Sequence, residues 1–196
     1  MDDALKDRVF GPSSFVKLKK INYRDGRMAT FSELIDRVYF AFKNKDDDFG
    51  RNLMKCISIE NGSLFGDTAI IYGPDFVSVV DRAEIGDFGL LIDENNCRKV
   101  SYGYKIGEQT SCELANNSLL VALVNGQERA EKVAEIASDF KLNPIFVPLS
   151  KKDVKSIEIR FPLFFLGNKK YPNSDRLYVH AYDDIYGSGY SLAKFD

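Results

Sequence analysis

The sequence predicts an α+β fold: an antiparallel β-meander or curled sheet with an N-terminal amphipathic helix, continuing into a βαβ unit and a closing hairpin. Three patterns support this expectation: apolar residues at helical spacing after Thr30, short β-rich segments between residues 54 and 114, and a strand–helix–strand pattern from Leu120 to Leu149. A chain of 196 residues fits one domain or two small fused ones. We expect one compact unit over residues 1–196, with a subdivision into 1–114 and 115–196 as the alternative.

The N-terminal helix is expected from Thr30 to Asn44. Thr30 and Glu33 have the spacing of a capping box. A stripe of apolar residues at helical spacing follows, and its members are Phe31, Leu34, Ile35, Val38, Tyr39 and Phe42. A stripe with this many aromatic residues predicts burial against a sheet. A partner-binding helix would show the same pattern. The opposite face lacks the lysine and arginine content of helices that lie on membranes.

Turn signals divide the middle of the chain into short strands. Asn61-Gly62 is a strong hairpin signal, and the turn Gly73–Asp75 leads into a further strand. The segments 88–93 and 97–104, on either side of Glu94-Asn95-Asn96, have the pattern of a second hairpin. We also expect a strand over 109–114.

The βαβ unit is expected from two continuous apolar runs, 118–124 and 144–149, on either side of a helical pattern. Such runs are typical of parallel strands buried on both faces. A phosphate site at the helix start would need several glycines. Only Gly126 is present, and Glu128 in the first turn disfavours an anion. We therefore expect no nucleotide here and no bound cofactor.

The closing hairpin consists of predicted strands at 157–161 and 176–182. Period-two alternation places basic and aromatic side chains opposite the apolar ones. These side chains, with two lysines of the connecting loop, are the candidate binding residues: Arg160, Lys169, Lys170, Arg176, Tyr178, His180 and Tyr182. They suit a protein interface or base stacking. We favour a protein partner or a homo-oligomer over nucleic acid, because acidic residues dominate between Asp46 and Asn96 and would repel a polyanion.

An enzymatic alternative rests on aspartates near strand ends. Asp67, Asp75 and Asp81 would hold Mg²⁺ if their carboxylates converged, which would make the protein a metal-dependent phosphoesterase or nuclease. Aspartates at strand ends are also ordinary turn residues. The single histidine, His180, lies in the middle of a predicted strand without a serine nucleophile motif. The sequence therefore favours a non-catalytic binding or assembly domain over this alternative.

Cysteine content and hydropathy indicate a cytoplasmic protein. Cys56, Cys97 and Cys112 are odd in number and show no C-x-x-C spacing, so we expect neither a disulfide framework nor a zinc site. No apolar run approaches the roughly 20 residues that span a bilayer. The first residues are charged and do not resemble a signal peptide. We therefore expect no membrane contact.

Overall fold

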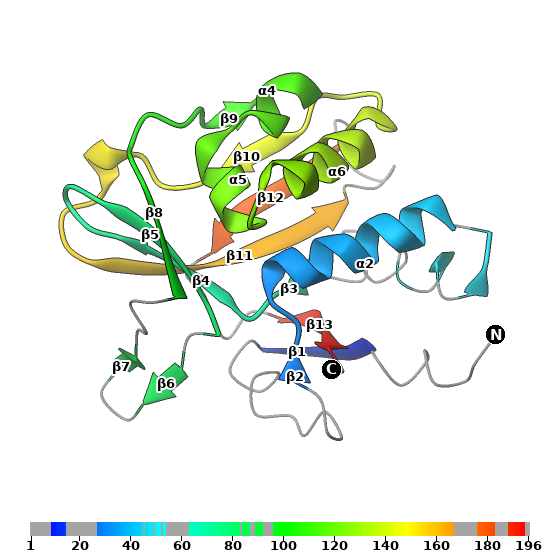
Figure 1. Cartoon of the computed structure of the whole chain (residues 1–196), viewed down its shortest axis with the longest axis horizontal. Helices are drawn as coiled ribbons and strands as arrows, with labels where there is room; N and C mark the ends of the chain where they lie inside the picture. Colours follow the sequence, from blue (N-terminus) through cyan, green and yellow to red (C-terminus); the bar gives the residue numbers. More distant parts are fainter. Residues whose placement is uncertain are drawn as a thin grey trace.

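The protein is an α+β domain, as the sequence predicts. Its structure, a computed structural model, describes residues 9–14, 27–44, 46–48, 50–51, 53, 63–82, 84–86, 89–91, 96–166, 176–182 and 188–194 (Figure 1). The helices are α2 (Phe31–Lys43), α4 (Ser111–Ala115), α5 (Ser118–Leu123), α6 (Gln127–Ser138) and the 3₁₀ turn η3 (Lys151–Asp153). None of the helices in these ranges is long and apolar enough to cross a lipid bilayer.

The strands are β1 (Val9–Ser14), β2 (Arg27–Met28), β3 (Ser63–Phe65), β4 (Thr68–Tyr72), β5 (Val77–Asp81), β6 (Glu84–Gly86), β7 (Gly89–Leu91), β8 (Cys97–Val100), β9 (Gly107–Glu108), β10 (Ile145–Val147), β11 (Glu158–Leu166), β12 (Leu177–Tyr182) and β13 (Ser188–Lys194). The main sheet has the order β1-β13-β3-β11-β12-β10-β9, with β2 beside β13. A branch leaves β11 through β4 to β5 and β8. Strands from both halves of the chain thus share one sheet.

The long strand β11 connects the two parts of this sheet. Its first residues, 158–160, pair with β4, and residues 161–166 pair with β12 in the antiparallel hairpin that the sequence predicts. Helices α4, α5 and α6 lie over one face of strands β10, β11 and β12, and α2 runs beside α6 (Figure 1). The sheet therefore has a helix-covered face and an opposite face.

Helix α2 begins at the predicted capping box. The Thr30 side chain accepts a hydrogen bond from Glu33 N–H, and the Glu33 carboxylate accepts one from Thr30 N–H. On its polar side, Asp36 accepts hydrogen bonds from Arg129 Nε at 2.7 Å and Lys132 Nζ at 3.0 Å, both from α6. The capping box fixes where α2 starts, and the ion pairs fix its side-by-side packing with α6.

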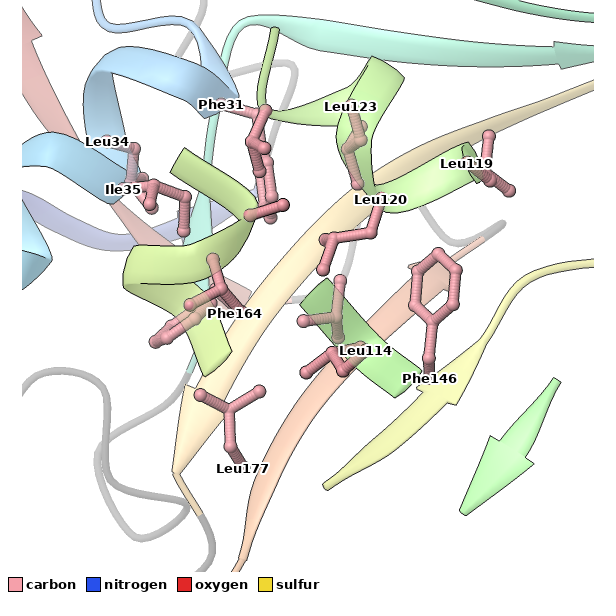
Figure 2. Packing of buried hydrophobic residues seen from close by; sticks show 14 of the residues in the cluster. Phe31, Leu34, Ile35, Leu114, Leu119, Leu120, Leu123, Phe146, Phe164 and Leu177 are labelled. Carbon is pink, nitrogen blue, oxygen red and sulfur yellow. The ribbon is translucent and has the colours of Figure 1, made fainter. Parts of the chain in front are cut away.

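Five of the six residues of the apolar stripe of α2 are core, as predicted, and Tyr39 is half-buried. Phe31, Leu34, Ile35 and Val38 have no exposed surface, and Phe42 is 9% exposed. They join the buried side chains of α4, α5, α6 and of the helix-facing side of the sheet in one cluster (Figure 2). The β3–β4 connection packs closely against the start of α2. A Cβ added at Gly66 would lie only 2.5 Å from the Phe31 backbone.

Two predicted strands are helices instead. Residues 109–114 were expected as a strand but contain the start of α4, where Thr110 and Glu113 form a second capping box. Residues 118–124 contain α5, and the Asn117 side chain caps it by accepting from Leu119 N–H and Leu120 N–H. Continuous apolar character arose here because short helices buried on several sides also lack a polar stripe.

The strand–helix–strand order is nevertheless present, with β9 as its first strand. β9 pairs antiparallel with β10, and β10 pairs parallel with β12. The predicted turn at Gly73–Asp75 does join β4 to β5 in a hairpin. The predicted second hairpin is wrong: β7 pairs with β6, while β8 covers the outer edge of β5. The hairpin expected at Asn61-Gly62 lies outside the described residues.

Replacing a core residue of α2 should destabilise the protein strongly. Leu34→Ala should lower the free energy of unfolding by about 2–5 kcal/mol, because it leaves a cavity in a fully buried cluster. Denaturant unfolding measures this change. Phe40→Ala on the same helix is the control: Phe40 is 54% exposed, so its truncation should cost no more than about 0.5 kcal/mol. Equal effects of the two substitutions would contradict the assignment of the stripe.

Candidate functional site

The face of the sheet opposite the helices carries part of the predicted binding set. Tyr178 and His180 of β12 are half-buried, whereas the alternate residues Leu177 and Val179 are buried in the core on the helix side. Figure 2 shows Leu177 and Phe164 pointing into the cluster that also contains Leu114. Alternation along the strand therefore turns Tyr178 and His180 away from the helices.

Neighbouring strands extend this surface. Tyr178 is paired with Phe165 on β11 and Ile145 on β10, and His180 has Val147 as its β10 partner. The Phe165 and Tyr178 rings stack with centroids 4.7 Å apart and planes 7° apart. All five side chains are half-buried. We call Ile145, Val147, Phe165, Tyr178 and His180 the open sheet face.

The two predicted arginines of this set do not present free charge to the open sheet face. Arg176 is 8% exposed, and its Nη1 donates to Glu108 Oε2 at 3.0 Å at the edge of this surface. The hydrogen bond from Arg176, with a second from Asn143, lowers the pKa of Glu108. The Arg176–Glu108 pair thus forms a polar border to the apolar surface.

Arg160 lies on the other face of the sheet. Phe161 pairs with Tyr182, so the side chain of Arg160, one residue earlier, alternates to the helix-facing side. It is close enough to Tyr72, a core residue, to act on the pKa of its hydroxyl, and it forms an ion pair with Glu158. Tyr182 is the last residue of β12, two positions after His180. Lys169 and Lys170 fall outside the described ranges. The structure therefore places only part of the predicted binding set on the open sheet face.

The three aspartates of the enzymatic alternative do not converge. Asp81 lies at one end of the β4–β5 hairpin, opposite Thr68, and the backbone carbonyl of Asp67 accepts from Arg82 N–H beside it at 2.8 Å. Asp75 lies in the turn at the other end, roughly 16 Å away for a five-residue strand. There it pairs with Lys151 at 3.0 Å. Within the described ranges no three His, Cys, Asp or Glu side chains group to hold a metal ion, and the geometry does not support the alternative.

A polar cleft of about 520 Å³ lies where α2 begins, β5 ends, β8 begins and α5 is followed by α6. The sequence alone does not predict this cleft. Its described lining residues come from four separate parts of the chain: Thr30, Ser32, Glu33, Asp81, Arg82, Asn96, Cys97, Arg98, Asn125 and Arg129. We call this the polar cleft. The polar cleft forms only when these segments pack against one another, so no local sequence motif predicts it.

A chain of hydrogen bonds holds the walls of the polar cleft. Phe31 N–H donates to Thr68 Oγ1 at 2.9 Å, and Thr68 Oγ1 donates to Asp81 Oδ1 at 2.6 Å. Arg98 Nη1 donates to Asp81 Oδ2 at 2.7 Å, and Arg98 Nε donates to the Ala122 carbonyl at 2.7 Å. The chain joins the start of α2, the β4–β5 hairpin, β8 and the end of α5. Asp81 is thus engaged through both oxygens.

Glu33 stays ionised at the cleft. Burial alone would raise its pKa, but the Arg27 guanidinium, which donates through both Nη atoms at 2.7 and 2.6 Å, and Thr30 N–H outweigh burial and hold the pKa at about 2. Arg129 pairs with Asp36. Arg82 is exposed, and its side chain makes no hydrogen bond or ion pair within the described part of the chain. One cationic side chain at the cleft is therefore unneutralised.

Comparison with known proteins supports the fold. No protein-family model matches the chain, and no curated protein matches it. One solved structure does match, and it is described as "Accommodation of massive sequence variation in Nanoarchaeota by the C-type lectin fold". The match has a TM-score of 0.64 at 15% sequence identity and covers 95% of this chain and 97% of that one. This chain therefore has a fold similar to the C-type lectin fold.

Acid should weaken the α2 start through Glu33. Its folded-state pKa of about 2 lies below the usual 4.5, so its stabilising contribution is present above pH 4.5 and is lost as the pH falls towards 2. The contribution is on the order of 2 kcal/mol, allowing for the partial exposure of the ion pair. Unfolding followed from pH 6 to about pH 2 should show a smaller loss of stability in Glu33→Gln than in the wild type.

Glu128→Gln is the matched control for this titration. Glu128 is also in the first turn of a helix, but its side chain is 83% exposed. Its variant should follow the wild-type pH profile closely. A Glu33→Gln profile parallel to that of the wild type would show that the Arg27–Glu33 pair contributes nothing to stability.

Proposed function

We propose that the protein is a non-catalytic binding domain that binds a protein partner through the open sheet face. The single observation that carries this proposal is the stacked, half-exposed pair Phe165–Tyr178, with Ile145 and Val147 beside it, on the face of the sheet that the helices leave uncovered. Aromatic side chains of this kind are the anchors of protein interfaces, where they bring large apolar area with few rotatable bonds.

The border of the open sheet face also suits a protein partner. The Arg176–Glu108 pair lies beside Ile145, because Glu108 is the β9 partner of that residue. Protein interfaces combine an apolar centre with a polar rim of this type. A rim pair contributes mainly to specificity and to the rate of association.

Nucleic acid fits this surface less well. Binding to phosphates needs cationic groups that can release counterions. Arg176 is buried against Glu108, and Arg160 lies on the opposite face against Glu158. The aromatic surface could stack on bases, but the described arginines near it are already neutralised by carboxylates.

The fold likeness is compatible with a binding role. The similar structure is described as one in which the C-type lectin fold accommodates massive sequence variation. A scaffold that keeps its shape while side chains vary can present different surfaces to different partners. In this chain the buried cluster holds the sheet from the helix side, and the residues of the open sheet face do not belong to that cluster.

Truncating the central aromatic residue should weaken partner binding. Tyr178→Ala removes half of the stacked pair and should cost about 1–3 kcal/mol in affinity, as the loss of a central interface aromatic does. The measurement is capture of partners from a lysate of the source cells, followed by titration of the identified partner with the purified variant. Phe40→Ala, which truncates an exposed aromatic on α2, should bind as the wild type does.

Two results would contradict the proposal. The first is a partner that binds wild type, Tyr178→Ala and Phe40→Ala equally, because the open sheet face would then not be its site. The second is binding of single-stranded RNA or DNA that Tyr178→Ala abolishes, because the ligand of this face would then be nucleic acid.

A further inference from the structure

The polar cleft has features of a binding site that are independent of the open sheet face, with which it shares no residue. Two long helices begin at its wall: α2 contributes Thr30, Ser32 and Glu33, and the start of α6 contributes Asn125 and Arg129. A helix N-terminus carries a partial positive charge from its free N–H groups. At the start of α2 the N–H groups of Phe31 and Glu33 are already bound by Thr68 and Thr30, so α6 is the helix that directs positive potential into the cleft.

The acidic residues near these helix starts do not cancel that potential. Glu33 is held by Arg27, which is not itself a lining residue. Glu128, in the first turn of α6, is 83% exposed, pairs with Lys132 and does not line the cleft. The N-cap of α6, Gly126, provides no side-chain hydrogen bond. Glu128 therefore does not place a negative charge in the lining of the cleft.

Arginines dominate the charge balance of the cleft lining. Arg82, Arg98 and Arg129 face two carboxylates, Glu33 and Asp81. Arg98 neutralises Asp81, Arg27 neutralises Glu33, and Arg129 is matched by Asp36. Arg82 remains, exposed at the end of β5 with a positive φ of 57°. Among the described lining residues, a ligand that enters the cleft thus meets one net positive charge.

Neutral polar groups also line the cleft. Ser32 brings a hydroxyl, which is in hydrogen-bond contact with Thr30 Oγ1, and Asn125 brings a side-chain amide. Arg98 is fixed by hydrogen bonds to Asp81 and to the Ala122 carbonyl, so this wall is ordered before any ligand binds. Preorganised groups of this kind reduce the entropic cost of binding.

We propose that the polar cleft binds a small anion that bears a carboxylate or a phosphate group. Arginine is the side chain that best recognises both groups, because its planar guanidinium matches two oxygens at once. The volume of about 520 Å³ lies in the range of sites for small molecules and is too small for a macromolecule. Arg82 is the residue that holds the charge of the ligand.

The test is isothermal titration of the purified protein with inorganic phosphate and with citrate, at ionic strength held constant by sodium chloride. Binding of phosphate alone assigns a phosphate site, and binding of citrate alone assigns a carboxylate site. Arg82→Gln should weaken whichever binds by at least about tenfold. Lys141→Gln is the control, because Lys141 is an exposed cation beyond the far end of α6, and it should change the affinity by less than about twofold.

A second readout uses the cysteine in the cleft wall. Cys97 is half-buried there, whereas Cys112 is exposed elsewhere. In a protein carrying Cys56→Ser and Cys112→Ser, the bound anion should slow alkylation of Cys97, and Arg82→Gln should remove that protection. No binding of either anion at 10 mM, or equal binding by wild type and Arg82→Gln, would overturn the proposal.

Discussion

The ion pair between Asp81 and Arg98 is the interaction on which the polar cleft depends. Asp81 also accepts from Thr68, which in turn accepts from the first N–H of α2, and Arg98 reaches the Ala122 carbonyl at the end of α5. Two helices and two strand pairs are positioned by this one group of side chains. The carboxylate is half-buried, so its loss would leave a guanidinium that already has one buried nitrogen, Nη2, without a partner among the described residues. Removing one member of such a pair costs more than its net contribution, because the other charge stays buried.

The same architecture produces two surfaces of different character. On the helix side the sheet is covered, and the ends of α2, α5 and α6 meet the β4–β5 hairpin to form a polar, cationic cleft. On the other side β10, β11 and β12 present an aromatic surface whose nearby arginine, Arg176, is paired with Glu108. Charge is thus concentrated in the polar cleft, and aromatic area is concentrated on the open sheet face. In our proposals these two surfaces of one fold bind different ligands.

The sequence predicts those elements whose signals are local. Local patterns predict the α2 capping box and stripe, the β4–β5 turn and the final hairpin. Thr110 and Glu113 have the same capping-box spacing, and this spacing predicts the start of α4. Residues 118–124 were ambiguous in principle, since a short apolar run fits a buried strand or a buried helix equally. The sequence alone does not predict which face of the sheet carries Arg160, because this depends on the register between β11 and β12. A shift of one residue in that register moves every side chain of the strand to the other face. The polar cleft draws on segments from Thr30 to Arg129, so only the folded chain reveals it.

A double-mutant cycle on Asp81 and Arg98 tests the central claim most directly. The free energies of unfolding of wild type, Asp81→Ala, Arg98→Ala and the double variant give the coupling energy between the two side chains. A half-buried pair at 2.7 Å that joins separate elements should show a favourable coupling of about 1–3 kcal/mol. Millimolar Mg²⁺ should leave the wild-type value unchanged, since both oxygens of Asp81 are already engaged. Additive effects of the two substitutions, or stabilisation by Mg²⁺ that Asp81→Ala removes, would contradict the structural role assigned to this pair.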